Sequence, residues 1–412
     1  MKARLFLAAM ALPFAVSSAY AQDNAGVRIS GFGTAALTWS DTDQAEFARP
    51  NQASGVNKKP RTGVDSNLGL QADYAVNSWL SVTGQGLVRK DGEDSYGAEL
   101  TWAFAKAKLS DQLSVRVGRL VLPTFMISEY RNVGYANTFL RPPSEVYSQV
   151  PLNSVDGTDI TWQQGFGDTT LTAQLAFGRS KNTLSSGIKA ELTRLRALTL
   201  TAEHGPFTVR VGRTETRLTV DAPQFNSLVS ALNTAGNNFR ISQLNDMARL
   251  VDNHKKKGSF TSAGLGMDWN NIIVQTEYAN RKVDTASGST DSWYALGGYR
   301  FGKFTPYYSH AKLSVSSDFA NTVPTACAAG SLAACTPTVR ALNNALEGLR
   351  AGTNGSAQST DSIGLRWDFA SSAALKFQID RIKPDSKGLF VHSVSGFKGP
   401  VTVGAIAVDF IF

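Results

Sequence analysis

The sequence predicts an all-β protein: a 16-stranded antiparallel transmembrane β-barrel whose third loop folds into its interior. Sixteen runs of strand-like residues follow one another between Val27 and Phe412. The gaps between these runs are alternately long and short, as in an up-and-down barrel with one trimmed rim and one elaborated rim. Polar and apolar residues alternate within the runs, so each strand can present one face to lipid and the other to water.

The first 21 residues have the features of a secretory signal peptide. Lys2 and Arg4 precede the apolar stretch 5–16, and Ala19-Tyr20-Ala21 has the small residues of a cleavage site. We therefore expect 1–21 to be removed and 22–412 to form a single barrel domain. Without Lys2 and Arg4 the formal net charge falls from +8 to +6, a mild excess that does not indicate a nucleic-acid partner.

The expected strands continue to the last residue. They cover 27–39, 64–76, 78–90, 96–109, 112–118, 156–164, 168–180, 190–203, 205–220, 258–269, 271–283, 291–301, 303–315, 359–369, 373–383 and 400–412. Long gaps cover 40–63, 119–155, 221–258 and 316–358. Apolar residues at helical spacing predict helices at 225–235, 241–255 and 339–350, which we expect to cap the barrel mouth or to pack together.

The alternation is clear in 170–177, where Leu171, Leu175 and Phe177 share one face and Thr172 and Gln174 the other. A soluble sandwich would alternate as well, with its apolar face buried. Two features favour the membrane: the polar faces carry long charged side chains, and aromatic residues gather near strand ends. These aromatic residues are Trp39, Tyr74, Trp79, Trp162, Trp269, Phe301, Phe304 and Phe412. Because lipid cannot hydrogen-bond to the backbone, the sheet must close.

Cysteine and histidine are scarce. Cys327 and Cys335 are close together in a chain with the signal for export, which favours a local disulfide over two free thiols. The four histidines are scattered and fit no metal-ligand spacing, so we expect neither a metal nor a cofactor. No window holds about 18 consecutive apolar residues, so no membrane-spanning helix is expected.

The segment 119–155 has neither strand alternation nor a helical stripe. It mixes aromatic, charged and proline residues, and a structureless loop of this length in a compact domain indicates a function. We expect it to enter the barrel and to narrow it, with fixed charges at the narrowest point. The loop residues expected to supply these charges are Glu129, Arg131, Arg141 and Glu145.

The wall opposite the loop requires charges of its own. Candidate basic residues on polar strand faces are Arg28, Arg89, Arg116, Arg210, Arg366 and Lys376. We expect Glu129 and Glu145 to face Arg28, Arg89 and Arg116, because opposed carboxylates and guanidiniums create a transverse field that orders water. For each of these residues the alternative is a rim charge or a salt bridge that holds the loop.

Two further basic groups lie toward the elaborated rim. Arg194 and Arg196 share the parity of the apolar face, so they either contact anionic lipid headgroups or mark a bulge where the register shifts. The run 255–257 consists of three lysines, which are expected to form a solvated loop tip, to contact lipopolysaccharide or to attract anions.

The chain resembles the general porins of Gram-negative bacteria over essentially all of 22–412. The resemblance rests on the sixteen runs, the terminal Phe412, the long loop after Val117-Gly118-Arg119, and the segment 298–304, GYRFGKF. It implies an outer-membrane homotrimer in contact with the lipid bilayer and lipopolysaccharide. It also implies a third loop whose acidic groups face a basic cluster. The acidic PEFG-like element of that loop is absent here, with Leu122-Pro123-Thr124-Phe125 near its place, and 141–147 (RPPSEVY) is not a feature of the family.

Three functions are compatible with this pattern. The first is passive diffusion of small hydrophilic solutes and ions, with a mild anion preference suggested by the excess of arginine. The second is a barrel enzyme using His310 or His392, but no nucleophile motif accompanies either residue, so we expect no enzyme. The third is a substrate-specific channel, for an anionic or another small solute, or an external binding protein.

Overall fold

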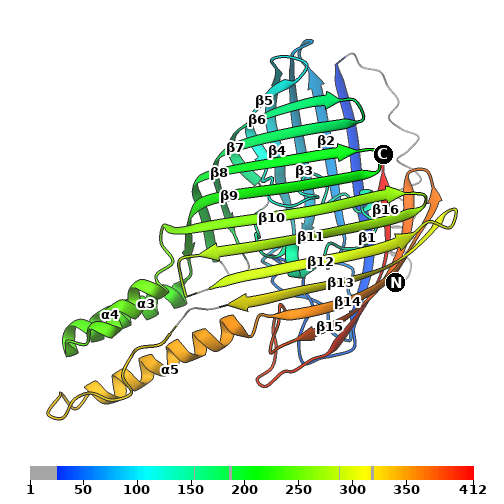
Figure 1. Cartoon of the computed structure of the whole chain (residues 1–412). Coiled ribbons are helices and arrows are strands. Elements are labelled where there is room, and N and C mark those ends of the chain that lie inside the picture. The colour runs from blue at the N-terminus through cyan, green and yellow to red at the C-terminus, as the bar shows by residue number, and fades with distance from the viewer. Residues whose placement is uncertain (1–25, 153, 185–187, 287, 317–319) are drawn as a thin grey trace.

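The protein is a closed barrel in the computed structural model, which describes residues 26–152, 154–184, 188–286, 288–316 and 320–412. Sixteen strands pair in sequence order, every pair is antiparallel, and β16 (Val401–Ile411) pairs with β1 (Val27–Ser40) to close the sheet. Figure 1 shows these two strands side by side. The predicted fold class is confirmed, whereas the predicted signal peptide 1–21 lies outside the described residues.

The strands between these two follow the predicted runs to within a few residues. They are β2 Asn67–Ala75, β3 Leu80–Lys90, β4 Tyr96–Lys108, β5 Leu113–Val121, β6 Ser154–Phe166, β7 Thr169–Thr183, β8 Lys189–His204, β9 Phe207–Asp221, β10 Lys256–Trp269, β11 Ile272–Val283, β12 Ser289–Tyr299, β13 Phe304–Ser316, β14 Gln358–Ala370 and β15 Ala373–Pro384. The main difference concerns the third outer loop, which joins β5 to β6. Because β5 continues to Val121 and β6 begins at Ser154, this loop covers 122–153 rather than 119–155.

Short turns join the strands at one rim and long loops join them at the other. The turn between β10 and β11 consists of Asn270 and Asn271, whose φ angles of 47° and 69° fit a two-residue hairpin turn. Gly205 and Gly302 have positive φ angles in neighbouring turns of the same rim. The elaborated rim carries the long loops, which in barrels of this class face the outside of the cell.

Three helices project beyond the elaborated rim (Figure 1). They are α3 Pro223–Phe239, α4 Ser242–Val251 and α5 Cys335–Asn354, and they pack around a common core that includes Leu232, Leu244 and Val339. The predicted disulfide is present and joins Cys327 to Cys335 across a Cα–Cα distance of 6.1 Å. The helices predicted at 225–235, 241–255 and 339–350 are confirmed. Within the described part of the chain, no helix is long and apolar enough to cross a membrane.

The apolar faces of the strands point outward. Leu175 and Phe177 are 42% and 49% exposed on β7, whereas Gln174 and Ala176, which alternate with them, are buried on the inner side. Ile363 on β14 is 68% exposed, and exposed aromatic side chains such as Trp79 and Trp269 lie at the strand ends, as in the girdles of membrane barrels. These positions exclude a soluble sandwich, which would bury the same apolar rows.

The inner wall is polar. Across β2, β3 and β4, Thr83 and Gln71 both donate hydrogen bonds to Asp73, at 2.6 and 2.8 Å. Gln85 continues this chain by donating to Gln71, and Thr101 donates to Gln85, each at 2.8 Å. Such a wall can be in contact with water along the interior of the barrel.

The outward position of the apolar rows can be tested by placing a charge among them. Leu200 is 47% exposed on β8, with Ala173 and Val211 as its register neighbours. We expect Leu200→Arg to lower the free energy of unfolding by about 3 kcal/mol, because a cation among lipid chains loses its hydration. The measurement is urea unfolding in lipid vesicles, with Thr172→Arg on the inner face as the control. Equal losses from the two variants would contradict the assignment of faces.

Candidate functional site in the barrel interior

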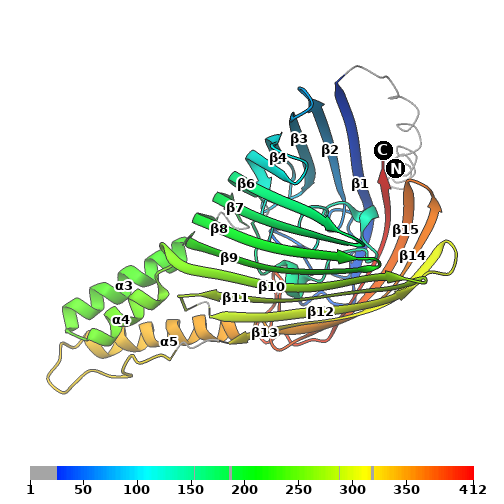
Figure 2. The same ribbon diagram turned by 45° about the horizontal axis from the view of Figure 1, so that its top comes forward.

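The described part of the segment between β5 and β6, here named the inner loop (122–152), lies inside the barrel. Figure 2 shows the strands curving around the chain segments that they enclose. Phe125 of this loop packs on Phe260 of β10 and on Tyr147, with ring centroids 5.2 and 4.7 Å apart. Phe139 packs against Tyr294 of β12 at 6.5 Å. The aromatic residues of the loop therefore attach it to the inner face of β10–β13.

Two strands hold the start of the inner loop through hydrogen bonds. Glu277 of β11 is buried and accepts hydrogen bonds from the Met126 backbone N–H at 2.8 Å and from the Tyr147 hydroxyl at 2.6 Å. Ser262 of β10 donates to the Thr124 carbonyl at 2.7 Å. Nothing in the strand pattern distinguishes these two polar residues from others that face the lumen, so sequence reasoning missed them.

Lys376 and Arg366 hold the far side of the loop. The Lys376 ammonium is fully buried, lies 2.8 Å from the Asp409 carboxylate, and donates to the carbonyls of Gly134, Asn137 and Phe139 at 2.7, 2.6 and 3.0 Å. Arg366 donates to the carbonyls of Tyr135 and Asn137 at 2.7 and 2.9 Å, next to the 3₁₀-helix η1 (Gly134–Ala136). A Cβ on Gly134 would lie 2.1 Å from Asp409 Oδ1, so this approach requires glycine.

These contacts correct the expected placement of Lys376. It was expected to line a constriction, but with no exposed side-chain surface it cannot face a solute. The physical reason is that an inward side chain meets either water or the inner loop, and here the loop carbonyls replace water around the charge. Arg366 is also mostly covered by the loop, with 14% of its side chain exposed.

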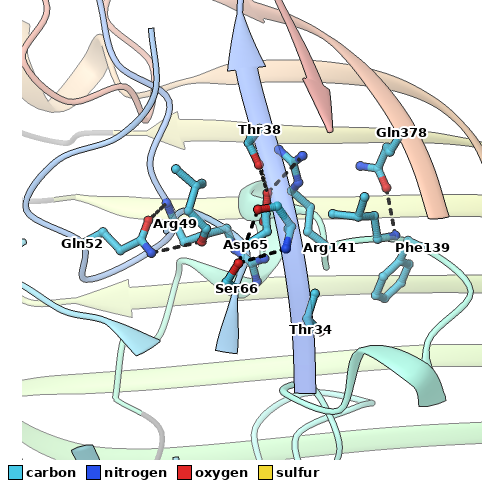
Figure 3. Close-up of polar contacts among 12 residues, drawn as sticks. Thr34, Thr38, Arg49, Gln52, Asp65, Ser66, Phe139, Arg141 and Gln378 are labelled. Atoms are coloured by element: carbon cyan, nitrogen blue, oxygen red, sulfur yellow. Dashed lines mark hydrogen bonds and ion pairs between the residues drawn. The ribbon is translucent and has the colours of Figure 1, made fainter. Parts of the chain in front are cut away.

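Arg141 joins the inner loop to the first long loop and to β15. Its guanidinium is buried, lies 3.3 Å from both Asp65 and Asp380, and stacks over the Phe47 ring at 4.8 Å. Figure 3 shows Asp65 between Arg141 and Arg49, close to Thr38 of β1. Arg49 lies 3.0 Å from Asp65, and Thr38 donates to the same carboxylate at 2.7 Å. Arg141 therefore holds the loop in place rather than lining a passage.

Glu145 is a second correction. It was expected to face Arg28, Arg89 and Arg116, but in the short helix α2 (Ser144–Tyr147) its side chain is only 2% exposed and points to β14. There its carboxylate accepts hydrogen bonds from Gln358 at 2.6 Å and from Thr360 at 2.5 Å. Burial raises the pKa of Glu145 above its ordinary value.

Glu129 and Arg116 do face each other, with 3.1 Å between the carboxylate and the guanidinium. Arg116 is also 2.6 Å from Asp159, its register neighbour on β6. Arg89 is ion-paired with Glu99 at 2.9 Å. Arg28 is exposed opposite Asp73 at the short-turn end of β1, away from the elaborated rim. Arg210 donates to the Pro123 carbonyl at 3.3 Å, so it too contacts the loop.

A cavity beside the inner loop is lined by four cations, here named the cationic opening: Arg49, Arg89, Lys90 and Arg131. Its lining includes one carboxylate, Asp65, which is already paired with Arg49 and Arg141. Arg131 is half-buried, and among the described residues it has no ion-pair or hydrogen-bond partner. Burial and the neighbouring Arg89 lower the pKa of Arg131 to about 10, so it is charged at neutral pH.

The opening combines predicted and unpredicted residues. Arg89 and Arg131 were expected at a constriction, on opposite sides of it. Arg49 and Lys90 were missed, because Arg49 lies in an irregular loop and Lys90 at a strand end, where alternation carries no information about position. The narrow space therefore presents cations from both the loop and the wall.

Comparisons with known proteins place this fold. No family model matches the sequence, and no curated protein matches it. Among solved structures, OmpF of Salmonella typhi, in complex with daunomycin, matches with a TM-score of 0.55 and 12% identity, covering 94% of this chain and 97% of that one. In vitro folded OmpT of Vibrio cholerae matches at 0.53 and 14%, covering 96% and 100%. The anion-selective porin of Comamonas acidovorans matches at 0.52 and 12%, covering 94% and 99%. The fold is thus that of outer-membrane porins.

The Asp65 cluster predicts how acid affects the attachment of the loop. Burial alone would raise the pKa of Asp65, but Arg141, Arg49 and Thr38 together hold it below its ordinary value of 3.8. The ionised carboxylate therefore stabilises the fold above about pH 3.8, and this contribution is lost as the pH falls through the lower folded-state pKa. We expect Asp65→Asn to cost about 3 kcal/mol at pH 7, because the buried Arg141 loses one of its two carboxylate partners and the half-buried Arg49 loses its ion pair.

The measurement is the free energy of unfolding of wild type and Asp65→Asn between pH 7 and pH 3. The difference between the two should be constant at neutral pH and shrink only in the acid range. Asp111→Asn, in an exposed turn at the other rim, is the control and should match wild type. A difference that grew on acidification would refute the ion-pair assignment.

Proposed function

We propose that the protein is an outer-membrane channel for passive diffusion of small hydrophilic solutes and ions, narrowed by the inner loop. The observation that supports this proposal is the attachment of the inner loop to the barrel wall. The loop is attached along β9–β16. The polar side chains of β2–β4 face the part of the interior that remains open to water. Water and solutes pass between this wall and the loop, beside Glu129, Arg116 and the cationic opening.

We propose a homotrimer in contact with the lipid bilayer and lipopolysaccharide. Support for the trimer comes from the in vitro folded OmpT of Vibrio cholerae, described as a trimer form, which matches with a TM-score of 0.51 and 13% identity. No enzymatic role is proposed. The two histidines considered for hydrolysis lie beside carboxylates, His310 at 2.7 Å from Asp361 and His392 at 3.1 Å from Glu46.

The diffusion function is tested by planar-bilayer recording of the refolded protein beside a variant lacking 125–147. Wild type should give stable, ohmic conductance steps. The deletion should increase single-channel conductance, because removing the loop widens the narrowest part of the passage. Unchanged conductance on deletion would remove the loop from this role, and absence of conductance in wild type would refute the channel.

A second and narrower function, preferential passage of anions, is favoured by the cationic opening. Arg131 on the loop faces the same cavity as Arg89 and Lys90 on the wall and Arg49 of the first loop. Like charges on both sides attract an anion into the space between them instead of creating a transverse field. One neighbour in the fold, the Comamonas acidovorans porin, is described as anion-selective.

The anion preference is tested by the reversal potential in a salt gradient. We expect wild type to favour chloride over potassium, and Arg131→Glu to lower that permeability ratio by about tenfold, because the charge change acts where solvent screening is reduced. Lys303→Glu, in an exposed turn at the short-turn rim, is the matched control. A cation preference in wild type, or equal effects of both variants, would contradict the proposal. Saturation of the current with one anion would favour a substrate-specific channel.

A further inference from the structure

A basic hollow of about 480 Å³ lies on the outer wall of the barrel toward the elaborated rim. Six cationic side chains line it, here named the outer basic hollow: Arg194, Arg196, Arg213, Arg217, Lys257 and Lys282. The lining includes two carboxylates, Glu215 and Asp284. Four adjacent strands, β8 to β11, thus place an excess of positive charge at one location.

The outer basic hollow belongs to the lipid-facing side, not to the lumen. Arg213 has the same parity on β9 as Val209 and Val211, which are 46% and 44% exposed. Arg196 has the same parity on β8 as Leu198 and Leu200, which are 42% and 47% exposed. The cations therefore continue the outward apolar rows directly, toward the elaborated rim.

A bulge in β8 adds one cation to the outward row. The register with β9 shifts between Thr193, which pairs with Arg217, and Arg196, which pairs with Glu215. Arg194 occupies the bulge with a φ of 51°, a left-handed conformation that a non-glycine residue adopts at a cost. Of the two alternatives raised by the parity of Arg194 and Arg196, the bulge is therefore present.

Most of this positive charge is not neutralised within the protein. Arg213 lies 3.4 Å from Glu215 and donates to Thr261 at 2.6 Å. In the described ranges, no ion pair involves Arg194, Arg196, Arg217, Lys257 or Lys282. The clustered cations repel one another unless an anion lies between them, so the hollow is suited to a polyanionic ligand.

The height of the hollow on the barrel identifies the source of the anion. Phe177 on β7 pairs with Arg196, and Tyr278 lies four residues before Lys282 on β11. Both are exposed aromatic residues of the kind found where lipid tails meet headgroups. We propose that the outer basic hollow binds the phosphate groups of a phosphorylated lipid of the external leaflet. Arginine matches phosphate with paired N–H donors, and the apolar rows below take the acyl chains.

This inference rests on the membrane location proposed above but not on the conductance of the pore. It is tested by native mass spectrometry of the purified protein in detergent with bisphosphorylated lipid A, dephosphorylated lipid A, or inorganic phosphate. Wild type should retain the bisphosphorylated lipid and lose most binding when the phosphates are removed. Arg196→Gln/Arg217→Gln should bind it more weakly by at least about fivefold per cation removed.

Two further variants make the result specific. Lys257→Gln/Lys282→Gln, on the other side of the hollow, should weaken binding similarly, while Lys303→Gln at the opposite rim should leave it unchanged. Conductance in planar bilayers should stay at the wild-type value in all three variants, which shows that the barrel is folded and separates this test from that of the channel. Equal binding of phosphorylated and dephosphorylated lipid, or wild-type affinity in both double variants, would overturn the proposal. Binding of inorganic phosphate as strongly as the lipid would overturn the assignment of a lipid ligand.

Discussion

The structure depends on one constraint: a sheet surrounded by lipid must satisfy every backbone N–H and C=O group within itself. The pairing of β1 with β16 meets this requirement, because it removes the two edges that the other fifteen pairings would leave. Closure at sixteen strands also produces an interior too wide to be filled by the strands' own side chains. The inner loop occupies part of that space, and what remains is open to water.

The position of the inner loop is decided by buried charges. Lys376 of the wall pairs with Asp409 and donates hydrogen bonds to carbonyls of the inner loop. Arg141 of the inner loop pairs with Asp65 of the first long loop and with Asp380 of β15. Buried ion pairs contribute little net stability when compared with apolar packing, but losing one partner is costly. They therefore restrict the loop to a single placement, and that placement leaves Glu129 and Arg131 toward the remaining space.

Strand alternation predicted most of the barrel but only part of the site. It placed Leu175 outside and Gln174 inside, and apolar residues at helical spacing predicted the helices around Leu232 and Val339, because burial periodicity is a local property. Alternation also identifies Lys376 and Arg116 as inward residues. Alternation cannot show that carbonyls of the inner loop surround Lys376. Nor can it show that the carboxylates of Glu129 and Asp159 both pair with Arg116. Glu145 lies in a helix of four residues and Arg49 in an irregular segment, and neither is long enough to show a period that indicates a direction.

The sequence by itself determined the strand number, the side of each strand that meets lipid, the elaborated rim and the disulfide. Each of these follows from spacing along the chain. Only the tertiary structure decided which charges hold the inner loop and which line the remaining opening, because these contacts join residues far apart in sequence, such as Gly134 and Lys376. It also decided that Arg131 faces Arg49 and Arg89 rather than a row of carboxylates, since the direction of a loop side chain depends on how the whole loop is anchored.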